Sequence, residues 1–388
     1  MAQLTWTGRA ATAAGCALLC AAGCVALGQR APDEDPENRT ATTAAPADPQ
    51  AGPAARAELG WLGTLPARGS GPRLLSGYFG GYGSGFDAHA WSAGGHLPGL
   101  IGCDYADIAP NGHPVLDTSC NAQLRAYAAA GGLVTVSVHG PNPAGGSLDT
   151  PLSPAQFAQL TQPGTAIGKA WTAQLDTLAA GLRQLSDGGV PVLFRPLLEM
   201  NGGAFWWDGQ SPAAFRAVWQ DMVTRIGARL GPTDHQVLWV WSPGCGSGGQ
   251  GDAGIEAYYP GDAYADVIGA DCYTNQPTAG VVAQTYRDLS GFAARHGKVF
   301  AFSEIGGDNA GDGAASRVDF AAWITALQHD YPRTAYFLAW NGPVGPTGAH
   351  NGNGASLLTD PGVIDQGQAA AQGLRSAAQG LRAAASGG

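Results

Sequence analysis

The sequence predicts an α/β fold, namely a (β/α)8 barrel of the TIM type. Two observations carry this prediction. Eight short apolar runs follow one another from residue 73 onward, and helix-like segments separate many of them. The 388-residue chain is also 45% hydrophobic, which is sufficient for a large core. Near-continuous apolar strands that alternate with amphipathic helices indicate a parallel sheet covered by helices, and eight such units are typical of this barrel.

The apolar runs define the expected strands. They cover residues 74–81, 99–107, 132–140, 190–200, 236–244, 266–274, 298–306 and 334–342. Active groups of such barrels lie at the carboxyl ends of the strands. The residues that end these runs are polar or aromatic: Tyr78, Asp104, His139, Glu199, Trp241, Ser242, Tyr273, Glu304, Trp340 and Asn341. An open doubly wound sheet is the alternative, but it needs a phosphate-binding first turn that the sequence lacks.

Three segments between the runs carry helix signals. Residues 211–231 begin with Ser211 as N-cap and Pro212 at the first helical position, and they close on Gly231. Residues 278–297 and 317–331 repeat apolar side chains at i, i+3 and i+4. We therefore expect amphipathic helices over all three.

The N-terminal residues differ in composition from the rest of the chain. Residues 1–28 combine Arg9 with an apolar, Ala-rich run, which is typical of an export signal. A single membrane-spanning helix is the alternative. The residues that end at Cys24 resemble a bacterial lipobox, so lipidation of Cys24 and simple secretion both remain open. Residues 29–72, rich in Ala and Pro, predict a disordered linker, and residues 73–388 form the expected catalytic domain.

Four cysteines follow the export segment, which is an even number, as expected for disulfides in an oxidising compartment. Three pairings are possible. The short separations favour Cys103–Cys120 and Cys245–Cys272. No CxxC motif is present, so we expect no zinc site, and we expect no other metal.

Charge excludes one class of function. Only 13% of residues are charged, against about 25% in ordinary globular chains, and the formal net charge is −10. A nucleic-acid partner is not expected, because affinity for a phosphate backbone requires clustered Lys and Arg. We expect a monomer, and the only membrane contact we expect is the lipid anchor that lipidation of Cys24 would supply.

Two glutamates indicate the chemistry. Glu199 and Glu304 end the fourth and seventh runs, and each follows a strongly apolar stretch. Paired carboxyl groups at one end of a barrel suit glycoside hydrolysis, in which one protonates the leaving oxygen and the other attacks, or activates water, at the sugar carbon. An apolar and aromatic setting raises the pKa of the acid, and residues 205–207 (FWW) are expected to supply it.

The segments around these glutamates resemble glycoside hydrolase family 26, which contains many endo-β-1,4-mannanases. The segment FRPLLEMNGGAFWWDG (194–209) is similar to the acid/base segment of that family. Five further segments match in the same order: VSVHGPNP, VLWVWSPG, YYPGDAYADVIGADCY, AFSEIG and LAWNG. The resemblance spans roughly residues 75–362 and implies the same barrel, a retaining mechanism and no cofactor.

The resemblance also implies a role for each matching residue. Glu199 is the implied acid/base and Glu304 the implied nucleophile. Tyr273 hydrogen-bonds the nucleophile, and Arg195 supports the carboxylates electrostatically. The other implied substrate-binding residues line the cleft: His139, Asn201, Trp206, Trp207 and Trp340. Of these, Trp340 stacks under the sugar at the cleavage site, and the two tryptophans form the leaving-group side.

One residue departs from the family pattern. The family usually carries His directly before the acid/base, and here Leu198 takes that position. The substrate implied by the resemblance is the polysaccharide β-1,4-mannan, and another β-glycan, such as β-1,3-xylan or mixed-linkage glucan, is the alternative. A non-catalytic carbohydrate-binding lipoprotein on the same barrel is a further alternative.

Overall fold

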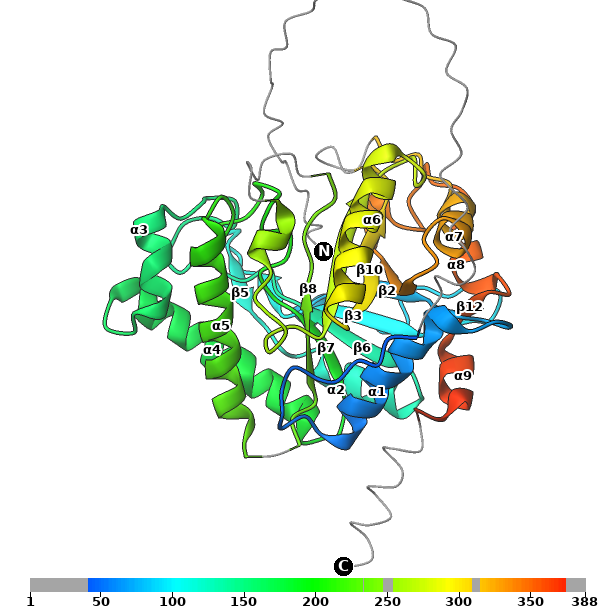
Figure 1. Ribbon diagram of the computed structural model, residues 1–388. Coiled ribbons are helices and arrows are strands. Elements are labelled where there is room, and N and C mark those ends of the chain that lie inside the picture. The colour runs from blue at the N-terminus through cyan, green and yellow to red at the C-terminus, as the bar shows by residue number, and fades with distance from the viewer. Residues whose placement is uncertain (1–40, 233, 247–253, 309–314, 375–388) are drawn as a thin grey trace, which may run out of the picture.

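The computed structural model describes residues 41–232, 234–246, 254–308 and 315–374, and within them eight parallel strands close into a barrel (Figure 1). The barrel strands are β2 (Gly77–Tyr82), β3 (Leu100–Asp104), β6 (Leu133–Ser137), β7 (Val192–Arg195), β8 (Val237–Trp241), β9 (Val267–Tyr273), β10 (Val299–Gly306) and β11 (Thr334–Ala339). Pairing of β10 with β11 closes the sheet. Each strand falls in one expected run, except that β2 extends one residue beyond its run, to Tyr82, so the (β/α)8 barrel is confirmed.

Helices surround the strands, as Figure 1 shows. The long ones are α2 (Asn121–Ala129), α4 (Ala166–Ser186), α5 (Pro212–Leu230), α6 (Gly280–Arg295) and α7 (Phe320–His329). The short ones are α3 (Pro154–Phe157), α8 (Ser356–Thr359) and α9 (Gln366–Ala369). The start of α5 matches its prediction, because Ser211 Oγ accepts a hydrogen bond from the N–H of Ala214.

Short strands lie outside the barrel proper. β1 (Leu74–Leu75) pairs with β11 and with β12 (Val363–Ile364), while β4 (Ala106–Ile108) and β5 (Pro114–Leu116) form an antiparallel hairpin after β3. None of the helices in the described part of the chain combines the length and hydropathy needed to span a membrane.

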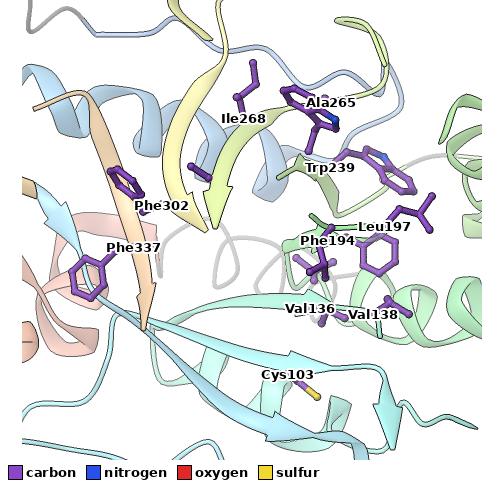
Figure 2. Close-up of a cluster of buried hydrophobic side chains, with 14 of the residues drawn as sticks. Cys103, Val136, Val138, Phe194, Leu197, Trp239, Ala265, Ile268, Phe302 and Phe337 are labelled. Atoms are coloured by element: carbon purple, nitrogen blue, oxygen red, sulfur yellow. The ribbon is translucent and has the colours of Figure 1, made fainter. Parts of the chain in front are cut away.

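The core has two layers that follow from strand alternation. One face of each strand packs against the helices, and this layer holds large side chains such as Phe194, Trp239 and Phe302 (Figure 2). The other face fills the barrel interior with smaller side chains such as Leu193, Leu238 and Val267. The buried interior fixes the strand ends on which the site is built.

The predicted linker is wrong from residue 53 onward. Helix α1 (Pro53–Thr64) packs Leu59 and Leu62 onto the layer that fills the barrel interior. The N–H of Ala55 donates to Gln236, one residue before β8, so α1 covers the amino-terminal end of the barrel. The buried leucines make this segment part of the domain despite its linker-like composition. Residues 1–28 with Cys24, and residues 29–40, lie outside the described residues.

Both preferred disulfides are formed. Cys103 on β3 is bonded to Cys120 before α2, and Cys245 after β8 is bonded to Cys272 on β9. The two bridges join segments that are 17 and 27 residues apart in the sequence.

Candidate active site

Glu199 lies on a turn that follows β7. The backbone of Leu197 and of Glu199 has φ of 45° and 51°, a left-handed conformation that is unfavourable for residues other than glycine. The N–H of Glu199 donates to Ser242 O at 2.8 Å, which ties the turn to the end of β8. Such backbone geometry is concentrated at functional sites. Here the turn brings the Glu199 carboxyl group to the carboxyl ends of the strands.

Glu304 lies within β10 and is held by two partners. Arg195, the last residue of β7, donates to Glu304 Oε1, and the Tyr273 hydroxyl donates to Glu304 Oε2. The side chains of Glu304 and Arg195 are almost fully buried. Both contacts agree with the roles that the sequence resemblance implied for Arg195 and Tyr273. Each oxygen of this carboxylate therefore has a fixed partner.

Asp271 is a third carboxylate at the site, and the sequence analysis missed it. Its Oδ2 accepts from Arg195 at 2.8 Å and its Oδ1 from Ser303 Oγ at 2.6 Å. Asp271 and Tyr273 are two residues apart on β9 and share one face of the strand. That alternation is the sequence signal that identifies Asp271, since a candidate at Tyr273 implies a second one at 271.

The three carboxyl groups converge. One oxygen each from Glu199, Asp271 and Glu304 lies within 4.8 Å of the others. Three carboxylates are ligands that a cation accepts, but the Arg195 guanidinium already pairs with Asp271 and Glu304. The positive charge in this cluster is therefore the Arg195 guanidinium.

The electrostatic surroundings raise the pKa of two carboxyl groups at the site, those of Glu199 and Asp271. Burial raises the pKa of Glu199 well above its ordinary value, and the negative charges of Glu304 and Asp271 raise it further. Burial also raises the pKa of Asp271, Arg195 opposes that rise, and Glu304 adds to it. These surroundings therefore favour the protonated form of Glu199, which is the form that a general acid requires.

Aromatic side chains line the site next to Glu304. Trp340 follows β11 and stacks on Phe79, with ring centroids 3.7 Å apart and an interplanar angle of 4°. The His139 ring lies 6.1 Å from Trp340 and 5.2 Å from Phe205, both edge to face. Trp340 is half-buried, so an indole supported from below is available to stack with the apolar face of a sugar.

His139 is oriented by a buried carboxylate. Asp104 is fully buried, and its carboxylate accepts from the Ser137 hydroxyl at 2.6 Å and from the His139 N–H at 3.0 Å. His139 Nδ1 lies 2.7 Å from the same carboxylate. Hydrogen bonds from His139 and Ser137 help to hold the pKa of Asp104 below its ordinary value, although burial opposes this. Asp104, which ends the second predicted run, thus fixes the His139 ring and does not face the cleft.

A cavity of about 680 Å³ opens beside Glu199. Its lining includes Tyr258, Tyr273 and both cysteines of the Cys245–Cys272 disulfide. Many other lining residues are glycines: Gly202, Gly203, Gly209, Gly244 and Gly246. At these five positions the backbone itself bounds the space next to the acid.

The structure corrects two of the predicted substrate-binding residues. Trp206 and Trp207 are each only 1% exposed and do not line the cleft. The Trp206 indole N–H donates to Gly140 O at 3.1 Å, and that of Trp207 donates to Leu198 O at 2.7 Å. These buried hydrogen bonds hold the loop that carries both tryptophans against the segments that follow β6 and β7. Asn201, in contrast, lines the cavity beside Glu199, and it exchanges two hydrogen bonds with the Gly244 backbone.

Two carboxylic side chains at the ends of the fourth and seventh strands of a (β/α)8 barrel, next to a half-buried tryptophan, define a glycoside hydrolase. The model of glycosyl hydrolase family 26 matches residues 47–368, and the chain belongs to this family.

Individual relatives agree with that assignment. The chain is 34% identical to mannan endo-1,4-beta-mannosidase A and B of Caldalkalibacillus mannanilyticus, over 84% of this chain and 64% of the relative's length. It is 33% identical to a mannan endo-1,4-beta-mannosidase of Bacillus subtilis, over 84% and 90% of the two chains. The solved structure of the Bacillus subtilis mannanase man26 superposes with a TM-score of 0.70 at 31% identity, over 84% of this chain and 96% of that one.

Proposed function

We propose that the protein is a retaining, endo-acting hydrolase of β-1,4-mannan, with Glu199 as acid/base and Glu304 as nucleophile. The observation that carries this proposal is the approach of the Glu199 and Glu304 carboxylate oxygens to within 4.8 Å. Retaining glycosidases hold their carboxyl groups about 5–5.5 Å apart, whereas inverting enzymes separate them by about 6.5–9.5 Å to admit a water molecule. The spacing here supports direct attack.

The proposed reaction has two displacements. Glu304 attacks the anomeric carbon while Glu199 transfers its proton to the departing glycosidic oxygen, which leaves a glycosyl ester on Glu304. The Glu199 carboxylate then takes a proton from water, and the hydroxide attacks the same carbon and releases Glu304. Arg195 and Tyr273 keep the attacking carboxylate oriented. Trp340 stacks with the sugar at the cleavage position.

The proposal of mannan as substrate rests on the relatives, which are named as mannan endo-1,4-beta-mannosidases. Leu198, which stands where the family usually has His, is 1% exposed and packs in the core. The polar group that precedes the acid/base in the family is thus missing here. Because Leu198 cannot make the polar contacts of the family's His, activity on other β-glycans should be measured beside activity on mannan.

Export is part of the proposal. Two disulfides support folding in an oxidising compartment. The apolar segment 11–28 supplies a signal, and lipidation at Cys24 provides an anchor to a membrane. A polysaccharide is too large to enter a cell intact, so an enzyme for it has to work outside.

The test is release of reducing ends from β-1,4-mannan, mixed-linkage glucan and β-1,3-xylan. The wild type is expected to act mainly on mannan, and the Glu199→Ala and Glu304→Ala variants are expected to release little from any of the three. Equal release by wild type and both variants contradicts the catalytic assignment. Preferential release from another β-glycan would make that polysaccharide the substrate instead of mannan. Binding without release would favour a non-catalytic carbohydrate-binding protein.

A further inference from the structure

The Cys245–Cys272 disulfide lies beside Glu199 and directly precedes Tyr273, the hydrogen-bond partner of Glu304. Cys245 is half-buried, Cys272 is fully buried, and both line the cavity beside Glu199. Their Cα atoms are 5.0 Å apart. The bridge joins the segment after β8 to the end of β9, and each of these segments contacts one of the two glutamates.

On the first side the bridge holds Gly244. A Cβ placed on Gly244 would lie 3.6 Å from Glu199 Cγ, so this backbone packs directly against the acid side chain. Gly244 also donates to Asn201 Oδ1 at 2.8 Å and accepts from Asn201 Nδ2 at 2.9 Å. The segment thus covers Glu199 and is fastened to the turn that carries it.

On the second side the bridge holds Tyr273. Tyr273 directly follows Cys272, and its hydroxyl donates to the nucleophile Glu304. The Cys245 N–H donates to Asp271 O at 2.8 Å, and the Asp271 N–H donates to Pro243 O at 3.0 Å. Two backbone hydrogen bonds and one covalent bond therefore fix the end of β9 against the segment after β8.

We propose that the Cys245–Cys272 disulfide is a positioning element of the active site, and that a dithiol reductant entering the cavity opens it and lowers turnover while the barrel stays folded. This inference rests on the proposed function. The other bridge, Cys103–Cys120, joins β3 to α2 and does not line the cavity. It serves as the matched control.

The reductive step balances. A thiolate of the reagent attacks the more accessible Cys245 sulfur, the S–S bond breaks, and Cys272 leaves as a thiolate that takes up a proton. The second thiol of the reagent then attacks the mixed disulfide and releases Cys245 as a thiol. Two electrons and two protons pass from the dithiol to the protein, and the reagent becomes a cyclic disulfide.

Opening the bridge is expected to change the protonation of the acid. More of the Glu199 side chain is exposed to water once Gly244 moves away, and the contribution of burial to its raised pKa decreases. The charged and titratable groups that act on Glu199 are Glu304, Asp271, Asp208, Arg195 and Tyr273. Opening the bridge also releases the segment that carries Asp271 and Tyr273, so the expected shift combines the greater exposure of Glu199 with the displacement of these two neighbours.

The experiment compares the wild type, Cys245→Ser/Cys272→Ser and Cys103→Ser/Cys120→Ser on mannan. We expect the first pair of substitutions to lower kcat by about tenfold or more, since small displacements of reacting groups are costly. We also expect the basic limb of its kcat/KM profile to move to lower pH. We expect the control pair to lower Tm while kcat stays within about twofold.

The wild type is also treated with dithiothreitol below its Tm and then reoxidised. Loss of kcat that returns on reoxidation, with alkylation of Cys245 and Cys272 in the reduced sample, supports the proposal even where the double variant does not fold. Unchanged kcat and pH profile after reduction of this bridge overturn it. Failure of the wild type itself to cleave mannan contradicts the proposed function instead, so the two outcomes are distinguishable.

Discussion

Glu304 and Glu199 are the same residue type at the ends of two strands of one barrel, yet their surroundings are opposite. Glu304 has a guanidinium on one oxygen and a phenol on the other. Glu199 is covered by the backbone of Gly244 and faces two other carboxylates. Two hydrogen bonds, one of them from a guanidinium, orient the nucleophile, whereas burial and negative neighbours raise the pKa of the acid. The division of roles thus comes from the surroundings of each side chain.

The largest effects on activity are expected when each glutamate is removed in turn. Glu304→Ala is expected to lower kcat by about 10⁴-fold or more on every substrate, because no other group forms the glycosyl ester. Glu199→Ala is expected to lower kcat on mannan by about 10²–10⁴-fold. It should retain the first step on an aryl β-mannoside with a good leaving group, since that step requires no proton.

The measurement is pre-steady-state release of the phenol, with Glu256→Gln as a surface control. Identical behaviour of the two alanine variants on the aryl mannoside would show that the roles are not divided in this way.

A smaller effect is expected at Asp271, which connects the two environments. Asp271→Asn removes the negative charge that helps to hold Arg195 under Glu304. We expect kcat to fall by about tenfold through loss of orientation. The same change takes a negative neighbour away from Glu199, so its pKa falls and the basic limb of kcat/KM moves to lower pH.

Ser303→Ala is the control for Asp271→Asn, because it removes a hydrogen bond to Asp271 and keeps the charge. Loss of this hydrogen bond raises the pKa of Asp271 somewhat, so we expect the basic limb of its profile to move much less than that of Asp271→Asn. A profile for Asp271→Asn that matches the wild type would contradict the electrostatic part of the comparison.

The smallest effect on activity is expected at a carboxyl group far from the site. Glu58 on α1 is 5% exposed, and its Oε1 lacks a hydrogen-bond partner. Burial raises its pKa from 4.5 to about 8. The folded state therefore binds a proton that the unfolded state releases above pH 4.5, and this contribution to stability is lost as the pH rises toward 8.

Glu58→Gln should remove this pH dependence. Relative to the wild type, its free energy of unfolding is expected to rise by at most about 1.4 kcal/mol per pH unit between pH 5 and 8, with kcat unchanged. Urea unfolding at several pH values measures it, and Glu256→Gln on the surface should show no such trend. Parallel curves for Glu58→Gln and the wild type would mean that Glu58 is ionised in the fold.

Sequence patterns predicted the barrel because apolar strands leave a clear signal, and they predicted the catalytic pair because Glu is rare after residue 73. Burial was harder to predict. Trp206 and Trp207 lie in the core because their indole N–H groups bond to loop carbonyls, a preference that composition does not reveal. In α1, the three-residue spacing of Leu59 and Leu62 was hidden among Ala and Pro.

The most direct test of the central claim is to identify the residue that forms the glycosyl ester. The Glu199→Ala variant is incubated with a 2,4-dinitrophenyl 2-deoxy-2-fluoro-β-mannoside and digested, and its peptides are analysed by mass spectrometry. The comparison of the two glutamates predicts one sugar on the peptide that contains Glu304 and none after Glu304→Ala. A sugar on another carboxylate, or products of inverted configuration from the wild type with no adduct, would contradict it.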